Sequence, residues 1–525
     1  MQLIVRFSGW LALLGVSLVT LLSFYGLIGF SDQGPDWQLF SDSYFYSILS
    51  FSIQQAFLSA LFSVLLAWPV ARAIYYQPNL PGVKAFLSLC LLCFVMPTLV
   101  LITGLVALLG GNGLVTPAFE LLLGEGWDIY GLGGILLAHT YLNMPFAIRI
   151  FYQQLNAIPD SSWQLASQLK LTPWQRFRIV EWSSLSGQAL TLFGFIFVLC
   201  FNSFAIVLAL GGGPQSTTLE VAIYQALKYD FNIPEALMLA WAQLLIAGGF
   251  FMLVSRLGKA NWLSVDTASR LWTPNAKGYR GRMMQLTYLV AWVCLVLPMV
   301  ALLVGVTDTD QSLKLAELLV PTVTSLGLGL FSATLGVVMA WVMLNPAREL
   351  NRRGATRQQL VVEWIASHGL VAPAMVVSVG LFIFLLQHID IDRWGMPVVA
   401  LLNTFVVIPF AIQKLKPRLL QFDAQYYDLC RSLKVSGFAL WKIQWPFVRP
   451  VFLTTFALLF VLAIGDVAIF SIFGNQSWQT LPWLIYGYAG SYRIAEASIA
   501  SLLLLGICSL ILWGFEKAQM EQKNV

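Results

Sequence analysis

The sequence predicts an all-α polytopic membrane protein of about twelve transmembrane helices, arranged as two parallel repeats of six spans. Composition is the first observation: 58% of the 525 residues are hydrophobic, 10% are charged, and the mean hydropathy is +0.76. In soluble domains about a quarter of the residues are charged. The second observation is a series of apolar runs of about 20 residues, each long enough to cross a ~30 Å hydrocarbon core. The third is an internal duplication.

Six apolar runs of spanning length lie in each half of the chain. The expected spans are residues 8–30, 54–76, 85–110, 132–153, 187–210 and 236–257, followed by 285–306, 322–344, 360–387, 395–413, 451–473 and 494–515. The first run is too long for the apolar core of a signal peptide, and no small-residue cleavage site follows it. We therefore expect it to be retained as a span.

The duplication is clearest in two polar segments, Pro145–Ser183 and Pro409–Pro446. Both begin with the sequence PFAI, and the register set by this match pairs Leu165 with Leu429. One register held over such a length indicates two copies of one ancestral unit. Because each half has an even number of spans, both copies enter the membrane from the same side, so the repeats are expected to be parallel.

Lysines and arginines predict the orientation. With both termini in the cytoplasm, only Lys228, Lys314, Arg393 and Arg493 of the 30 basic residues fall in outer loops. The opposite orientation would reverse the positive-inside bias of membrane proteins. Both polar segments are therefore expected to face the cytoplasm. The predicted domains are a first repeat at 1–257 with a cytoplasmic loop at 154–186, a cytoplasmic linker at 258–284, and a second repeat at 285–525 with a cytoplasmic loop at 414–450.

Each polar segment has the pattern of a short amphipathic helix. Leu165 and Leu169 lie one turn apart on one helix face, as do their counterparts Leu429 and Leu433. An apolar ridge with basic flanks suits docking into a groove on a partner, and two ridges suit two copies of that partner. A helix that packs beneath its own bundle, or lies on the lipid surface, is the alternative interpretation. The residues expected to end these helices are Pro173 and Gly437.

The first polar segment carries the sequence QLASQLK at 164–170, followed by TPW at 172–174. This resembles the "EAA" loop of binding-protein-dependent ABC importer permeases, which contains the coupling helix that docks on the ATP-hydrolysing subunit. The usual glycine of that loop is replaced here by Lys170 and, in the second copy, by Lys434. The resemblance assigns ATPase coupling to Ser162, Gln164, Leu165, Ala166, Leu169, Lys170 and Pro173, and to Asp428, Leu429, Cys430, Leu433, Lys434 and Gly437.

A longer resemblance covers nearly the whole chain. Residues 55–64, 130–149, 201–232 and 464–493 are similar to the permeases of thiamine (vitamin B1) ABC importers, which fuse two permease halves in one chain. The resemblance implies a type I importer fold in a bacterial inner membrane. It also implies two partners: two copies of a cytoplasmic ABC ATPase, and a periplasmic thiamine-binding protein that delivers the substrate.

The chain itself is not expected to be an enzyme. It contains no G-x-x-x-x-G-K-[ST] phosphate loop, so ATP and Mg²⁺ are expected on the partner ATPase and no cofactor on this chain. Its basic residues lie in loops between apolar runs, a distribution that indicates membrane topology and lipid contact rather than nucleic-acid binding.

Few polar residues fall inside the apolar runs, and these are the candidates for the substrate path. Asp466 is the main one, because an intramembrane carboxylate is costly and therefore a functional candidate. Its negative charge and a nearby aromatic ring such as Phe470 suit a cation with aromatic rings. A carboxylate near the outer interface that bonds neighbouring backbone is the alternative. The full set for the path or gate is Asn202, Ser203, Gly211, Gly212, Gly213, Tyr224, Asp466, Phe470 and Tyr486, with glycine turns required only by the backbone as the alternative for the three glycines.

The function predicted is transport of thiamine, with or without its phosphates, by alternating access. A permease for iron(III) or another small solute of the same family is the second hypothesis. An ion-coupled secondary transporter is a third, but such a protein would be expected to bury more charged residues and would not need two cytoplasmic docking helices.

Overall fold

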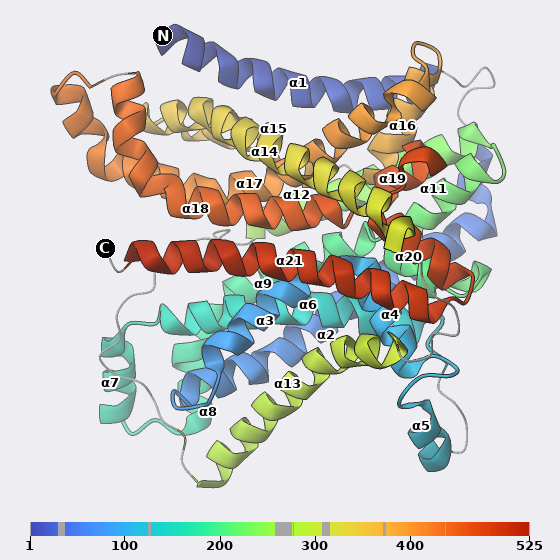
Figure 1. Cartoon of the computed structure of the whole chain (residues 1–525). Helices are drawn as coiled ribbons and strands as arrows, with labels where there is room; N and C mark the ends of the chain where they lie inside the picture. Colours follow the sequence, from blue (N-terminus) through green and yellow to red (C-terminus); the bar gives the residue numbers. More distant parts are fainter. Residues whose placement is uncertain are drawn as a thin grey trace. The chain divides into compact units, whose positions relative to one another are not determined.

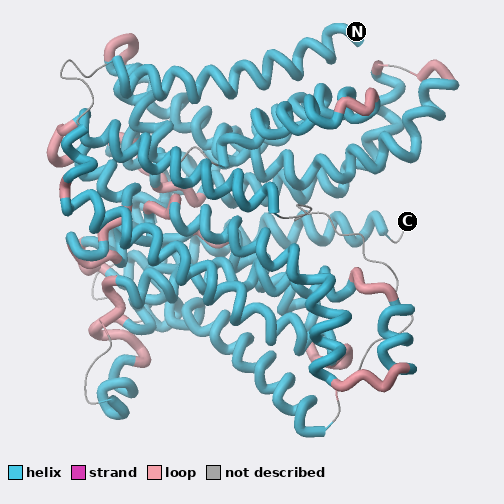
Figure 2. The backbone as a smooth tube through the Cα atoms, turned by 180° about the vertical axis from the view of Figure 1, so that it is seen from behind, coloured by secondary structure: helices cyan, strands magenta, loops and turns pink. Residues whose placement is uncertain are grey.

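The computed structural model describes residues 2–29, 37–123, 128–257, 276, 278–306, 315–370, 374–435 and 437–523. These ranges are helical and contain no β-strand, as the ribbon and tube views show (Figures 1 and 2). The predicted all-α class is confirmed.

Nine helices in the described ranges are long and apolar enough to cross a membrane, or ten if one bent pair is counted as a single span. The nine are α1 (Gln2–Gly29), α2 (Ser43–Tyr76), α9 (Trp182–Phe201), α12 (Ile233–Leu257), α13 (Gly278–Gly305), α14 (Leu315–Arg352), α17 (Ile391–Ser432), α18 (Phe438–Ile464) and α21 (Ile494–Lys523). The bent pair is α3 (Val83–Val95) and α4 (Thr98–Leu109), which meet at 104° beside Pro97. The chain is thus a polytopic membrane protein.

Besides run 85–110, which is divided between α3 and α4, three of the expected spans are interrupted in the structure. Run 187–210 is divided between α9 and α10 (Ala205–Leu210), and run 451–473 between α18 and α19 (Ala468–Phe473). Run 360–387 is divided among α15 (Thr356–Ser367), η5 (His368–Leu370) and α16 (Ala374–Leu386). Asn, Ser, Gly and Asp stand at the first two breaks, and these residues favour turns and caps over helix interiors.

The remaining helices are short, except for α6. They are η1 (Trp37–Ser41), α5 (Thr116–Leu123), α6 (Leu132–Asn156), α7 (Asp160–Gln168), α8 (Pro173–Arg176), η2 (Phe177–Glu181), η3 (Pro214–Ser216), α11 (Leu219–Lys228), η6 (Gln476–Trp478) and α20 (Leu481–Gly490). The expected span 132–153 lies within α6.

The chain forms two compact units. One, which we call the N-unit, comprises Ser43–Thr218 and Ile246–Thr309; the other, the C-unit, comprises Met1–Asp42, Leu219–Leu245 and Asp310–Val525. The units differ from the two sequence repeats because the first helix of each repeat packs in the unit formed mainly by the other repeat. The repeat boundaries stay a prediction, and residues 258–275 and 277 of the predicted linker lie outside the described residues.

Helix α2 is the centre of the N-unit and packs against α6, α9 and α13 (Figure 1). One face of α2 carries small residues at helical spacing, and all are fully buried: Ala56, Ala60, Ser63 and Ala67. Small side chains let helix backbones approach closely, which is how helices associate where lipid removes the hydrophobic driving force.

Helix α14 has the same role in the C-unit, where it packs against α17, α18 and α1. Ala333 and Ala340, the repeat counterparts of Ala60 and Ala67, are again fully buried. Helix α1 lies along α14 and α16 (Figure 1). At its contact with α16, Gly26 and Gly380 approach so closely that neither leaves room for a methyl group.

Candidate functional site

The first coupling helix, α7, is a separate helix at the predicted cytoplasmic end of the N-unit. Pro159 precedes it and Asp160 lies in its first turn, where a carboxylate interacts favourably with the helix dipole. Proline disfavours a helical conformation in the residue before it, so α6 ends before α7 begins.

The second coupling helix is not separate. Asp423 stands where the first copy has Pro159, and α17 runs without a break from Ile391 to Ser432 through the coupling segment. The two copies thus carry similar apolar ridges, one on a separate short helix and the other at the end of a long continuous helix.

Both coupling helices end in the same backbone motif. Leu171 N–H donates to Ala166 O at 3.1 Å and Lys170 N–H to Ser167 O at 3.0 Å, the two bonds of a Schellman cap. The second copy repeats them around Lys434, whose φ of +53° matches the +48° of Lys170. These lysines occupy the left-handed position that glycine usually takes. The helices therefore end at Gln168 and Ser432, earlier than the expected Pro173 and Gly437, which instead precede or begin the next helices.

The leucine ridges are exposed in both copies. Leu165 and Leu169 are 56% and 62% exposed, and Leu429 and Leu433 are 56% and 66% exposed. Among the other residues assigned to coupling, Gln164, Lys170, Pro173, Asp428 and Lys434 are exposed, and Ser162 and Gly437 are half-buried. Ala166 and Cys430 are buried beneath the two ridges, where they anchor each coupling helix to the rest of its unit.

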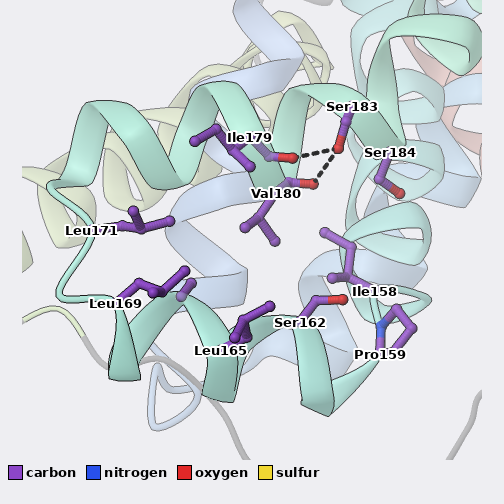
Figure 3. A pocket seen from close by; sticks show the side chains of 11 residues that line it. Ile158, Pro159, Ser162, Leu165, Leu169, Leu171, Ile179, Val180, Ser183 and Ser184 are labelled. Atoms are coloured by element: carbon purple, nitrogen blue, oxygen red, sulfur yellow. Dashed lines mark hydrogen bonds between the residues drawn. The ribbon is translucent and has the colours of Figure 1, made fainter.

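A groove of about 340 Å³ runs between α7 and the segment from η2 into α9 (Figure 3). Leu165, Leu169 and Ile179 point into it, and Ile158 and Pro159 close one end (Figure 3). Ser183 Oγ donates to the backbone oxygen of Ile179 at 2.6 Å, which leaves little polar character in the groove. Its lining suits an apolar side chain from a partner.

The candidate path residues lie at the two helix breaks. Asn202 and Ser203 follow α9, and Gly465 and Asp466 follow α18, at corresponding positions in the two repeats. Asp466 Oδ2 accepts a hydrogen bond from Ile469 N–H at 3.1 Å and so caps the short helix α19. Phe470 is 2% exposed, and its ring packs against Trp478 and Trp483 rather than lining an open surface in this conformation.

The candidate gate turns have a clear backbone role. Gly212 and Gly213 have φ of +72° and +141°, conformations open to glycine but strained for other residues, while Gly211 ends α10 with its N–H bonded to Val207 O. Tyr224 on α11 is buried, and Tyr486 on α20 is half-buried.

Sequence reasoning missed the buried carboxylates and their partners. Arg72 pairs with Glu181, and Arg348 with Asp423, at the bases of the coupling segments. Carboxylates in otherwise basic loops were the available signal. Glu220 on α11 was also missed; it is 1% exposed and accepts from Gln243 Nε2 at 2.7 Å.

Two results define the class of protein. The first is the polytopic helical fold with its duplicated polar segments. The second is a match of residues 63–257 to the family described as "Binding-protein-dependent transport system inner membrane component". The chain is therefore a multi-pass membrane permease subunit of an importer of this kind.

Full-length relatives make the assignment narrower. The chain is 36% identical to the thiamine transport system permease protein ThiP of Escherichia coli (strain K12) over 97% of this chain and 96% of that protein. It is 35% identical to ThiP of Haemophilus influenzae over 90% and 88% of the two chains. The chain belongs to the family of thiamine transport system permease proteins. A probable sulfate transport system permease protein of Chlorokybus atmophyticus is 26% identical over 45% of this chain and 87% of its own length.

Proposed function

We propose that this chain is the membrane permease of an ATP-driven importer that moves thiamine into the cytoplasm. The observation that carries the proposal is the near full-length similarity to two-half permeases named for thiamine transport. The shorter sulfate-permease match covers less than half of this chain and gives no comparable support for another solute.

The proposed partners are two copies of a separate cytoplasmic ATPase and a periplasmic thiamine-binding protein. The exposed leucine ridges of α7 and α17 would each dock on one ATPase, since an amphipathic helix binds a partner through its apolar face. Both chain termini would lie in the cytoplasm, as the distribution of basic residues predicts. ATP and Mg²⁺ would be bound by the ATPase alone.

The proposed mechanism is alternating access. ATP binding draws the two ATPases together and moves the docked coupling helices, and the permease switches between inward-open and outward-open states as packed rigid bodies. Release of thiamine from the binding protein at the outer face would coincide with the outward-open state.

Asp466 is proposed to supply a counter-charge for the thiamine cation on the path, in addition to capping α19. The variant Asp466→Asn keeps a side chain that caps helices well and removes the charge. We expect a raised KM for uptake, and an unchanged KM would leave Asp466 with the capping role alone.

The proposal is tested by uptake of labelled thiamine in cells that lack their own permease and receive this chain, its ATPase and its binding protein together. The double variant Leu165→Asp, Leu429→Asp should abolish uptake while the permease remains in the membrane, because charge on the ridges prevents docking. The control Ser167→Asp adds the same charge to the opposite face of α7 and should leave uptake intact.

Three outcomes would contradict the proposal at different points. Wild-type uptake of iron but not thiamine would assign the chain to the second hypothesis. Uptake without the ATPase would favour a secondary transporter. Uptake undisturbed by the double leucine variant would rule out docking through these ridges.

A further inference from the structure

A cluster built around a buried carboxylate joins α2 to the end of the first coupling segment. Arg72 Nε donates to Glu181 Oε2 at 2.9 Å, and Arg72 Nη2 donates to Glu181 Oε1 at 3.1 Å. The Tyr76 hydroxyl donates to the same Oε1 at 2.6 Å. The Glu181 side chain is 0% exposed. Two parallel charge-assisted bonds fix both the distance and the orientation of the groups that they join.

The same cluster reaches the coupling helix itself. Trp163 of α7 is 1% exposed, and its ring centre lies 5.6 Å from that of Tyr75 and 6.1 Å from that of Tyr76. Tyr76 therefore contacts both α7 and Glu181. Because α7 is separated from α6 at Pro159, this contact is a direct link from the coupling helix to α2.

The C-unit contains a second buried pair. Arg348 of α14 donates from Nη2 to Asp423 Oδ1 at 2.6 Å and from Nε to Oδ2 at 2.8 Å, and Arg352 adds a bond to Oδ2 at 3.4 Å. The Arg348 and Asp423 side chains are 8% and 5% exposed. In the orientation in which the Gln444 side-chain oxygen faces Arg348, this oxygen accepts from Nη2 at 3.0 Å and from Nη1 at 3.1 Å.

The two pairs are built from different positions of the duplicated segment. Glu181 corresponds to Gln444, and Asp423 corresponds to Pro159. The carboxylate thus follows the coupling helix in the N-unit and lies at its base in the C-unit. In both units it is nevertheless bound by an arginine from the central helix, α2 or α14.

We propose that Arg72–Glu181 and Arg348–Asp423 are positioning pairs that transmit the movement of each coupling segment to α2 and α14. This inference rests on the proposed function. Glu181 is fully buried and the Arg72 side chain is 26% exposed, while both partners of the second pair are buried. Buried carboxylates are little screened and two parallel bonds fix the geometry, so displacement of the carboxylate displaces the arginine and its helix. In the C-unit the continuous helix α17 is a second route for the movement. The N-unit, in which α7 is a separate helix, depends more strongly on its pair.

The test is the ratio of thiamine taken up to ATP hydrolysed, measured in proteoliposomes that contain the permease and its ATPase and are supplied with the binding protein. Glu181→Gln is expected to lower this ratio at least about fivefold, the lower end of typical coupling between sites. Asp423→Asn is expected to lower it less. The control Arg353→Gln breaks the ion pair that Arg353, just after α14, forms with Glu349; the Arg353 side chain is 58% exposed, and the ratio should stay unchanged.

A second variant separates positioning from stability. Arg72→Met combined with Glu181→Leu replaces the buried pair by apolar side chains, a change that is often neutral or stabilising. We expect thermal stability close to that of the wild type together with a low transport ratio.

Recovery of the ratio along with stability in this double variant would overturn the proposal, since the pair would then be only structural. An unchanged ratio in Glu181→Gln would overturn it as well, while leaving the proposed function intact. Absence of ATP-driven thiamine uptake by the wild type would overturn the proposed function and this inference together.

Discussion

Lys170 and Lys434 end the coupling helices in a left-handed backbone conformation, with φ of +48° and +53°. That conformation costs an L-residue about 1–2 kcal/mol, and glycine largely avoids the cost. Lys170→Gly is therefore expected to raise the thermal stability of the permease, by about 1 kcal/mol, in unfolding experiments in detergent. Lys170→Ala removes the same side chain but keeps the strain, so a gain of equal size in this control would contradict the explanation.

Glu220 lies on α11, outside the spans, in an environment that is unfavourable for a charge. Its Oε2 atom has no hydrogen-bond partner among the described residues, and burial raises the pKa of the carboxyl to about 8 from a usual value of 4.5. Between these two pH values the unfolded chain loses the proton and the folded chain keeps it. Stability is therefore expected to fall as the pH rises through this window, by about 1.4 kcal/mol per pH unit.

The variant Glu220→Gln keeps the shape of the side chain and cannot ionise. Thermal unfolding measured from pH 4.5 to pH 8 should show a much weaker decline for this variant than for the wild type, with the largest gain at pH 8. The exposed Glu120 is the control, and Glu120→Gln should leave the decline as it is. A wild-type stability that does not change between pH 4.5 and pH 8 would contradict the conclusion that Glu220 is buried in its protonated form.

At the scale of the elements, the contact of α1 with α16 depends on two glycines. A methyl group on Gly380 would collide with the backbone oxygen of Ser23, and one on Gly26 with that of Gly380. Gly→Ala inside a helix normally stabilises it by about 1 kcal/mol. Gly380→Ala is expected to destabilise the fold instead, by about 1–3 kcal/mol, because the helices must move apart.

The matched control is Gly15→Ala on α1, where nothing lies within 4 Å of the added methyl group. Thermal unfolding of the two variants in the same detergent should shift in opposite directions. Equal shifts would show that the close approach of α1 and α16 does not contribute to stability.

At the scale of the whole molecule, each unit contains segments from both halves of the sequence. The C-unit includes α1, α11 and the first part of α12, and the N-unit includes α13. Two co-expressed fragments, 1–257 and 276–525, are therefore expected to remain associated without a covalent link. Affinity purification of a tag on one fragment should recover the other.

The control for this experiment removes α1. A fragment that begins at residue 43 lacks the helix that packs on α14 and α16, so recovery of the partner fragment should fall. Full recovery without α1 would contradict its place in the C-unit, and no association of the complete fragments would contradict the exchange of helices altogether.

The coupling segments show how far sequence reasoning reaches. The apolar ridge was predictable because Leu165 and Leu169 follow the helical period, and the duplication located the second ridge at Leu429 and Leu433. The helix ends were placed too late, because a lysine at a left-handed position gives no local signal. Glycine in that place would have given one.

The sequence by itself determined the membrane class, the helical fold, the duplication and the family, because hydropathy, periodicity and similarity are properties of the chain as written. The tertiary structure alone decided the pairing of Arg72 with Glu181, the pairing of Arg348 with Asp423, and the exchange of first helices between units. These features depend on which distant segments meet. A charged side chain that the fold buries requires a partner. The sequence shows the charged residue but not which residue pairs with it.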